Sequence, residues 1–277
     1  MASNRARIDA LADALIDAWD GAHTLAPITA ADPSFDVASA YQVLHEIQTR
    51  RIAGGWKAVG RKIGFTNRTI LTRYGVHLPM WAYVFEHTVT HATDGRAKLS
   101  LARCVQPRIE PEIVFGLRDR VRGGHDVREA LDAVAWIAPG FEIVQSHFPD
   151  WKFQAADCTA AFGLHGALVV GEPVMLDDTL RDRLVEALPR FEVTLRHGDR
   201  IVDRGVGSNV LDGPAHALLH LARVLDDQPW AAPLAAGEMV TTGTITDAWP
   251  VHGGETWRSD YGALAMFGVR GLELAFD

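Results

Sequence analysis

Two glutamates separated by one residue, Glu110 and Glu112, are the first candidates for chemistry in this sequence. The apolar and β-branched residues around them indicate a strand, whose two-residue period places both carboxylates on one face. If that face is interior, their repulsion and desolvation require a cation, and a divalent metal that prefers oxygen ligands would supply one. Display on the surface is the alternative, because most glutamates are solvated and Pro111 is tolerated mainly at a sheet edge or strand start.

A third acid, Glu142, lies between Pro139-Gly140-Phe141 and Ile143-Val144, a run that indicates another strand. Three carboxylates from two adjacent strands could hold Mg²⁺ or Mn²⁺ and leave positions for water and substrate. Taken alone, Glu142 also fits a solvated strand position.

Lys62 is the candidate for proton transfer. It stands between small and apolar residues near the end of a predicted strand, in Gly60-Arg61-Lys62-Ile63-Gly64. If Lys62 is buried, desolvation lowers its pKa and suits it to shuttle a proton. A surface lysine is the alternative, because lysine is rarely buried.

Two further segments carry polar groups that could reach a pocket. Asp157 follows the aromatic run Asp150-Trp151-Lys152-Phe153, in a stretch that lines a pocket or forms a plain surface loop. Gly243-Thr244 closes a predicted strand and offers a hydroxyl and amides suited to a substrate carboxylate, or makes an ordinary turn.

Several other chemistries find no support in the sequence. The twelve histidines show no HExxH or mixed Cys/His ligand spacing, which argues against zinc. GxSxG, Walker A and dinucleotide-binding patterns are also missing, which argues against a serine hydrolase elbow, an NTPase and a dinucleotide enzyme.

Composition limits the partners. With 277 residues, 48% hydrophobic, and a formal charge of −8 without a long basic run, the chain can bury a substantial core and is a poor match for nucleic acid or an anionic membrane. Cys104 and Cys158 stand far apart, so no disulfide framework is indicated. No apolar run approaches a signal peptide core or a membrane span. We expect a cytoplasmic protein that acts on a small molecule.

The chain reads as a helical start followed by a β-rich body. Apolar spacing predicts helices over residues 5–19 and from 37, after Asp36 as N-cap, to Gly54-Gly55. The body is expected to contain strands over 58–64, 109–117, 141–144, 167–170, 191–195, 239–244 and 265–269, and helices over 127–136 and from Pro214 to 225.

This order does not alternate regularly between strands and helices, which argues against a parallel doubly wound sheet. The predicted class is α+β. Residues 1–55 form a helical segment that packs on the body, residues 56–277, to give a single domain.

The motifs, taken in order, resemble those of the 2-keto-4-pentenoate hydratase and 4-oxalocrotonate decarboxylase family, within the fumarylacetoacetate hydrolase superfamily. They are Lys62-Ile63-Gly64-Phe65-Thr66, Ile109-Glu110-Pro111-Glu112, Phe141-Glu142-Ile143-Val144, Asp150-Trp151-Lys152-Phe153, and the tail from Gly205 through Gly237-Glu238 to Gly243-Thr244. The resemblance covers nearly the whole chain, and the ordered set is more specific than any single motif.

The resemblance implies a β-rich roll or sandwich, a Mg²⁺ or Mn²⁺ ion, and a 2-oxo acid or its dienol as substrate. By position, Glu110, Glu112 and Glu142 resemble the metal ligands, Lys62 the active-site lysine, and Thr244 a hydroxyl near the substrate carboxylate. Asp157 is expected in the catalytic group. The family also implies a homo-oligomer that can associate with a homologous pathway enzyme.

The sequence departs from the family in two places. Pro79-Met80-Trp81-Ala82 stands where many hydratases have an Asp, and Cys158-Thr159-Ala160 follows Asp157 where close relatives read Asn-Ala-Ser. Both departures fall where substrate is gripped.

The leading hypothesis is therefore a carbon-oxygen lyase of aromatic-compound catabolism, a hydratase that converts a 2-hydroxy-2,4-dienoate to a 4-hydroxy-2-oxo acid. Decarboxylation of an oxalocrotonate-like diacid is the first alternative. Hydrolysis of an acylpyruvate is the second, with His45-Glu46 as a candidate pair to activate water. A binding subunit without catalysis is the third alternative.

Overall fold

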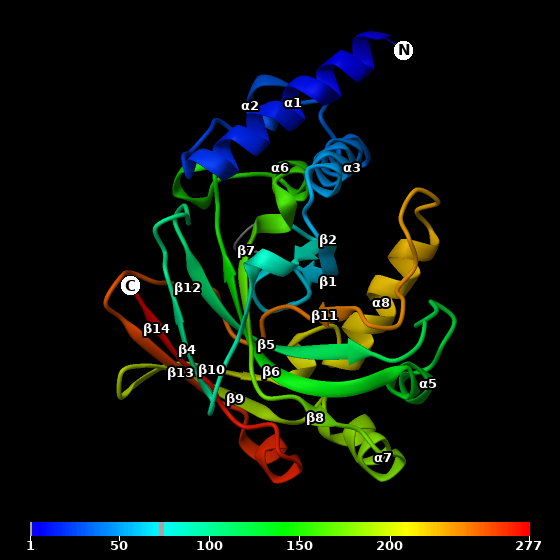
Figure 1. Cartoon of the computed structure of the whole chain (residues 1–277), viewed down its shortest axis with the longest axis vertical. Helices are drawn as coiled ribbons and strands as arrows, with labels where there is room; N and C mark the ends of the chain where they lie inside the picture. Colours follow the sequence, from blue (N-terminus) through cyan, green and yellow to red (C-terminus); the bar gives the residue numbers. More distant parts are fainter. Residues whose placement is uncertain (1, 72–74) are drawn as a thin grey trace.

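The computed structural model describes residues 2–71 and 75–277 and consists of two β-sheets with helices around them (Figure 1). The helices are α1 (Ala2–Gly21), α2 (Ile28–Ala31), α3 (Val37–Ala53), α5 (Val127–Asp132), α6 (Ala155–Ala160), α7 (Asp178–Ala187) and α8 (Pro214–Asp226). Short 3-10 helices are Glu86–Thr88, Pro149–Trp151, Phe162–Leu164, Gly207–Asn209 and Gly262–Phe267.

The larger sheet has nine strands and runs in the order β2-β1-β11-β5-β6-β7-β3, with β12 paired to β5 and β8 paired to β6. Its strands are β1 (Ala58–Gly64), β2 (Met80–Phe85), β3 (Val89–His91), β5 (Arg108–Leu117), β6 (Val134–Val144), β7 (His165–Val170), β8 (Val174–Met175), β11 (Met239–Thr241) and β12 (Trp249–Pro250). The smaller sheet has the order β10-β9-β13-β14-β4. Its strands are β4 (Arg96–Leu99), β9 (Glu192–His197), β10 (Arg200–Val206), β13 (Thr256–Asp260) and β14 (Glu273–Phe276).

The alternation of side chains along β5 sends its residues into different cores. Ile113 and Phe115 point to the side that packs against α8, and Ile109 points to the side that packs against the smaller sheet. Val114 points to the opposite, inner face, where it packs with Leu168 and Val170 of β7. The strand period gives Glu110 and Glu112 the same face as Val114.

The first 53 residues form a helical layer over one end of the sheets (Figure 1). Asp36 is the N-cap of α3, as expected, and its side chain accepts a hydrogen bond from Ser39 N at 2.8 Å. Apolar residues of α1 and α3 share one buried cluster with Ala160 of α6 and Phe162. No helix in the described ranges is long and apolar enough to cross a membrane.

Two predictions of secondary structure are wrong. The strand predicted over 265–269 is absent from the described chain: residues 265–267 are the end of the 3-10 helix Gly262–Phe267, which closes at Gly268 in the left-handed region with φ 92°. The helix predicted over 127–136 ends at Asp132, because Val134 and Trp136 pair with β5 as the start of β6. Their apolar spacing fits both structures, and the neighbouring strand decides.

Two prolines also lie deeper in the sheet than the sequence indicated. Pro111 sits in the middle of β5, and Pro139 sits in β6, which is much longer than the predicted 141–144. On the outer side of Pro111 the partner strands β11 and β12 are interrupted, and Pro139 lies between the parts of β6 that pair with β8 and β7. A missing N–H is tolerated at both interruptions.

Candidate active site

The three glutamates meet on the inner face of the larger sheet. Glu110 and Glu142 stand directly opposite each other in the antiparallel pairing of β5 with β6, and Glu112 follows two residues on. One carboxylate oxygen from each lies within 4.8 Å of the others. Glu112 and Glu142 are completely buried, and Glu110 is partly exposed to a cavity. The surface alternative for these residues therefore does not apply.

Burial and mutual repulsion shift the pKa values of these acids. Burial and the nearby Glu142 raise the pKa of Glu110 to about 8, and burial together with Glu142 and Glu110 holds the pKa of Glu112 well above its ordinary value. Burial also opposes charge on Glu142, but Lys62 and His165 outweigh it and lower the pKa of Glu142 to about 2. Without a metal, the cluster thus retains protons that a divalent ion would displace.

These shifts predict how the stability of metal-free protein depends on pH. A carboxyl whose pKa rises from 4.5 to about 8 on folding stabilises the fold fully below pH 4.5, and this stabilisation is lost as pH rises through about 8. We expect the free energy of unfolding of chelator-treated protein, measured by urea titration, to fall by roughly 2–4 kcal/mol between about pH 5 and pH 9. Saturating Mg²⁺ and the variant Glu110→Gln should each flatten the profile; a flat profile for metal-free wild type would contradict the raised pKa.

Lys62 reaches the same cluster from β1. Its Nζ lies 3.2 Å from Glu142 Oε2 and donates a hydrogen bond of 2.9 Å to the Gly163 carbonyl. The side chain is buried, as expected for a catalytic lysine, but its pKa does not fall. Burial alone would lower the pKa of Lys62, and the three surrounding carboxylates outweigh burial and raise it. In the metal-free site, Lys62 is therefore a charged donor.

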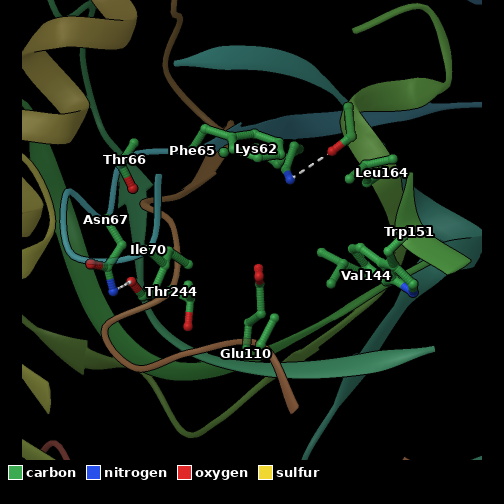
Figure 2. Close-up of a pocket in the computed structure, with 13 residues that line it drawn as sticks. Lys62, Phe65, Thr66, Asn67, Ile70, Glu110, Val144, Trp151, Leu164 and Thr244 are labelled. Carbon is green, nitrogen blue, oxygen red and sulfur yellow. Dashed lines mark hydrogen bonds between the residues drawn. The ribbon is translucent and has the colours of Figure 1, made fainter. Parts of the chain in front are cut away.

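A cavity of about 450 Å³, counting its mouth, opens between Lys62 and Glu110. Figure 2 shows these two side chains pointing towards each other from opposite walls. Thr244 lies beside them, and its carbonyl accepts a hydrogen bond of 3.0 Å from Asn67 Nδ2. The structure thus brings Thr244 into the lining of the cavity, where its hydroxyl bonds the Thr246 carbonyl at 3.1 Å.

The segment around Gly243 leaves the sheet in the interval between β11 and β12, which explains why the predicted strand 239–244 ends at Thr241. Gly243 has φ 93°, and a Cβ there would lie 1.9 Å from Thr66 Oγ1, so only glycine fits. Its N–H donates a 2.8 Å hydrogen bond to Glu112 Oε2. The Gly243 amide, which the sequence suggested for a substrate carboxylate, instead binds Oε2 of Glu112, a candidate metal ligand.

Asp157 is not brought to this group. It lies in the first turn of α6, where its side chain caps the helix by accepting from Gln154 N at 2.8 Å. The same carboxylate accepts hydrogen bonds from Thr29 N at 2.9 Å and Thr29 Oγ1 at 2.6 Å. Asp157 is buried and does not line the cavity, so its contacts connect the helical layer to the body.

We therefore expect Asp157→Ala to act on stability. Loss of the cap and of the contacts to Thr29 should lower the free energy of unfolding by about 2–4 kcal/mol. Metal affinity measured by calorimetry should remain within a few-fold of wild type, and the exposed acid Asp199, changed to Ala, serves as the control. A variant with normal stability and no turnover would return Asp157 to the catalytic group.

The two departures from the family contact each other. Thr159 Oγ1 lies 3.5 Å from Met80 Sδ, and Met80 packs in one buried apolar cluster with Cys158 and Leu164. Leu164 lines the cavity, and Ala82 pairs with Lys62 across β1 and β2. The two departures thus lie together and form part of an apolar wall close to Lys62.

The cluster fits a divalent cation. Within the described residues, Glu112 Oε1 is buried without a hydrogen-bond partner, and the buried Glu142 Oε2 has only the ion pair with Lys62, 3.2 Å away; both acids belong to the group of three converging carboxylates. Unpaired buried oxygens are costly, and a hard cation with oxygen ligands would satisfy them. Lys62 offers only one positive charge to the three acids.

The larger sheet carries three acids and a buried lysine on its inner face. This arrangement is typical of an α+β protein with a divalent-metal site. The pattern of the fumarylacetoacetate hydrolase C-terminal family matches residues 73–265. The chain belongs to this family, which confirms the resemblance and the fold class predicted from the sequence.

Individual relatives extend the match to most of the chain. The chain is 30% identical to a 2-hydroxyhexa-2,4-dienoate hydratase of Comamonas testosteroni, over 91% of this chain and 93% of the relative. It is 27% identical to a 4-oxalocrotonate decarboxylase of Pseudomonas sp. strain CF600, over 96% and 97%. The solved 4-oxalocrotonate decarboxylase of Pseudomonas putida G7, complexed with magnesium and adipate, superposes with a TM-score of 0.86 at 25% identity, over 99% of this chain and 98% of that chain.

Proposed function

We propose that this protein is a divalent-metal-dependent hydratase that adds water to a short 2-hydroxy-2,4-dienoate and gives a 4-hydroxy-2-oxo acid. The observation that supports hydration over decarboxylation is the cavity wall away from the acids. It is mostly apolar: its lining residues within the described ranges include no arginine or histidine, and the Arg108 guanidinium lies behind it, 4.1 Å from the centre of the Trp151 ring. The apolar members of this wall are Phe65, Ile70, Val144, Trp151, Leu164 and Ala248.

Such a wall suits a monocarboxylate with an unsaturated hydrocarbon end. A diacid of the oxalocrotonate type would place its second carboxylate against this wall, and an unpaired charge there is costly. The hydratase relative from Comamonas testosteroni is named for a monocarboxylate.

Glu110, Glu112 and Glu142 are the residues that would hold Mg²⁺ or Mn²⁺. When bound, the ion supplies a Lewis acid for the carboxylate and the neighbouring 2-oxo or 2-enol oxygen of the substrate. Thr244 would orient the substrate carboxylate if its hydroxyl exchanged the hydrogen bond to the Thr246 carbonyl for one to the substrate. The apolar wall would hold the unsaturated chain of the substrate by van der Waals contact.

Lys62 is the group that moves a proton. Its charged Nζ faces Glu110 across the cavity and is held in place by the Gly163 carbonyl. From there it can donate a proton to the conjugated system or stabilise a developing oxyanion. Both tasks need the protonated form, which the surrounding carboxylates favour.

The hydrolase alternative finds no geometric support. His45 packs against Trp230, with ring centroids 5.0 Å apart, and Glu46 is ion-paired with Arg5 and Arg50. Neither His45 nor Glu46 lines the cavity. The retained acids and lysine also count against a subunit without catalysis. The cytoplasmic location, the homo-oligomer and the association with a pathway enzyme stay predictions.

The decisive experiment assays a panel of 2-hydroxy-2,4-dienoates and 2-oxo diacids with Mg²⁺, with Mn²⁺ or with chelator. We expect loss of dienoate absorbance that requires the metal, with a product heavier than the substrate by one water in the mass spectrum. Release of CO₂ from a diacid, without hydration of the monocarboxylates, would replace hydration by decarboxylation. Turnover in excess chelator would contradict the metal requirement.

A further inference from the structure

His165 is a buried histidine beside Glu142, and its spacing to other residues in the sequence does not predict a place in the site. Its Nδ1 lies 2.7 Å from Glu142 Oε1, and its Nε2 lies 2.9 Å from Thr88 Oγ1. The Thr88 hydroxyl also bonds the Phe85 carbonyl at 2.8 Å, which fixes Thr88 beside the ring. The imidazole is thus held at both ends, and only 1% of the residue is exposed.

A break in strand register turns His165 towards the acids. Glu142 pairs with Leu168 and Ile143 with Ala167, but Val144 pairs with His165, so Gly166 is an extra residue on β7. In a regular strand, residues 165 and 168 would face opposite sides of the sheet. The extra residue, a β-bulge, places His165 on the face of Val144 and Glu142.

Gly166 is the residue that makes this bulge possible. A Cβ at position 166 would lie 2.6 Å from the Ile143 carbonyl oxygen, a contact that backbone atoms cannot relieve cheaply. The bulge therefore requires glycine at this position. Because of the bulge, Nδ1 of His165 points at the carboxylate of Glu142.

We propose that the bulge at Gly166 makes His165 a positioning residue for Glu142. His165 holds Oε1, which leaves Oε2 as the oxygen of Glu142 that faces the cluster, 3.2 Å from Lys62 Nζ. Glu142 thus offers one preset oxygen to a divalent ion. This inference rests on the proposed metal site and does not depend on the reaction carried out there.

Two matched substitutions test the proposal. Asparagine at position 165 carries its N–H near the position of His Nδ1 and can still bond Glu142, whereas glutamine carries it near Nε2 and reaches Thr88 instead. Calorimetric titration with MnCl₂, without substrate, measures the affinity of each. We expect His165→Asn to bind within about threefold of wild type and His165→Gln to bind roughly 10–100-fold more weakly.

The controls separate positioning from stability. Val169→Ala removes buried volume from the same strand on the opposite face, so it should destabilise the protein without changing the affinity for Mn²⁺. Circular dichroism and urea unfolding show whether each metal-free variant is folded. If His165→Gln does not fold, His165→Leu and Thr88→Val replace it, with weaker Mn²⁺ binding expected in both.

Equal affinities for wild type and the variants that lack the donor to Glu142 would overturn the proposal. Equal weakening of His165→Asn and His165→Gln would do the same, since it would show that only the ring shape matters. A wild-type protein that binds Mn²⁺ as expected but hydrates no dienoate would refute the proposed function and leave this inference standing.

Discussion

Replacing Glu112 by glutamine is expected to weaken the binding of Mg²⁺ by roughly 100-fold or more and to abolish turnover when Mg²⁺ is limiting. The substitution keeps the shape of the side chain and an oxygen that can accept from Gly243 N. It removes the negative charge that Glu112 would bring to a bound ion through Oε1, a buried oxygen with no hydrogen-bond partner among the described residues. The expected loss is therefore one of charge on a metal ligand, with little change in packing.

Two measurements decide the outcome. Calorimetry gives the Kd for Mg²⁺ and Mn²⁺, and the rate of dienoate loss is followed over a range of Mg²⁺ concentrations. Glu255→Gln makes the same change of side chain just before β13 of the smaller sheet, where Glu255 bonds Trp257 and His252, and it should leave both quantities unchanged. Full activity of Glu112→Gln at limiting Mg²⁺ would remove Glu112 from the ligands.

The pair of acids on one strand could be predicted because a single local rule determines it. A two-residue period places Glu110 and Glu112 on one face whatever strand lies beside them. Their depth could not be predicted from the same rule. The burial of these acids depends on β6, which pairs with β5 so that Glu142 lies directly opposite Glu110. The sequence of either strand alone does not determine this register.

Proline and glycine misled the prediction of β6. Pro139-Gly140 resembles a turn, and this shortened the predicted strand to 141–144, yet the two residues oppose Ile113 and Glu112 within the ladder. The strand tolerates Pro139 because of an interruption in its other partners, which is a property of the assembled sheet. Sequence patterns that span one element cannot contain this information.

His165 and Asp157 also show what a sequence pattern cannot predict: His165 lies at the site without a sequence signal, and Asp157 was expected there but lies elsewhere. Histidine spacing in a sequence indicates only metal ligands, whereas His165 contacts a carboxylate through a bulge that depends on how β7 pairs with β6. The Asp157 carboxylate bonds the N–H of Gln154, three residues earlier, as in a capping box, but Gln and Asp are not the residue types of that pattern, so the sequence does not reveal this structural use.

Replacing Lys62 by methionine is expected to lower turnover by a factor of roughly 10²–10⁴ and to leave the affinity for Mg²⁺ unchanged or increased. Methionine fills a similar volume without a charge or a donor. The loss of the donor removes the proton-transfer group that faces Glu110. The loss of the charge removes a cation that lies 3.2 Å from Glu142 Oε2 and repels a divalent ion.

This opposite response of rate and affinity separates catalysis from folding. A residue that only supports the structure would lose metal affinity and turnover together, whereas a proton-transfer residue loses turnover alone. Lys57→Met, at an exposed lysine paired with Glu86, controls for the change of charge on the neighbouring chain segment. A rate for Lys62→Met within threefold of wild type would exclude Lys62 from the reaction, and a large drop in Mg²⁺ affinity would assign it to the support of the acids.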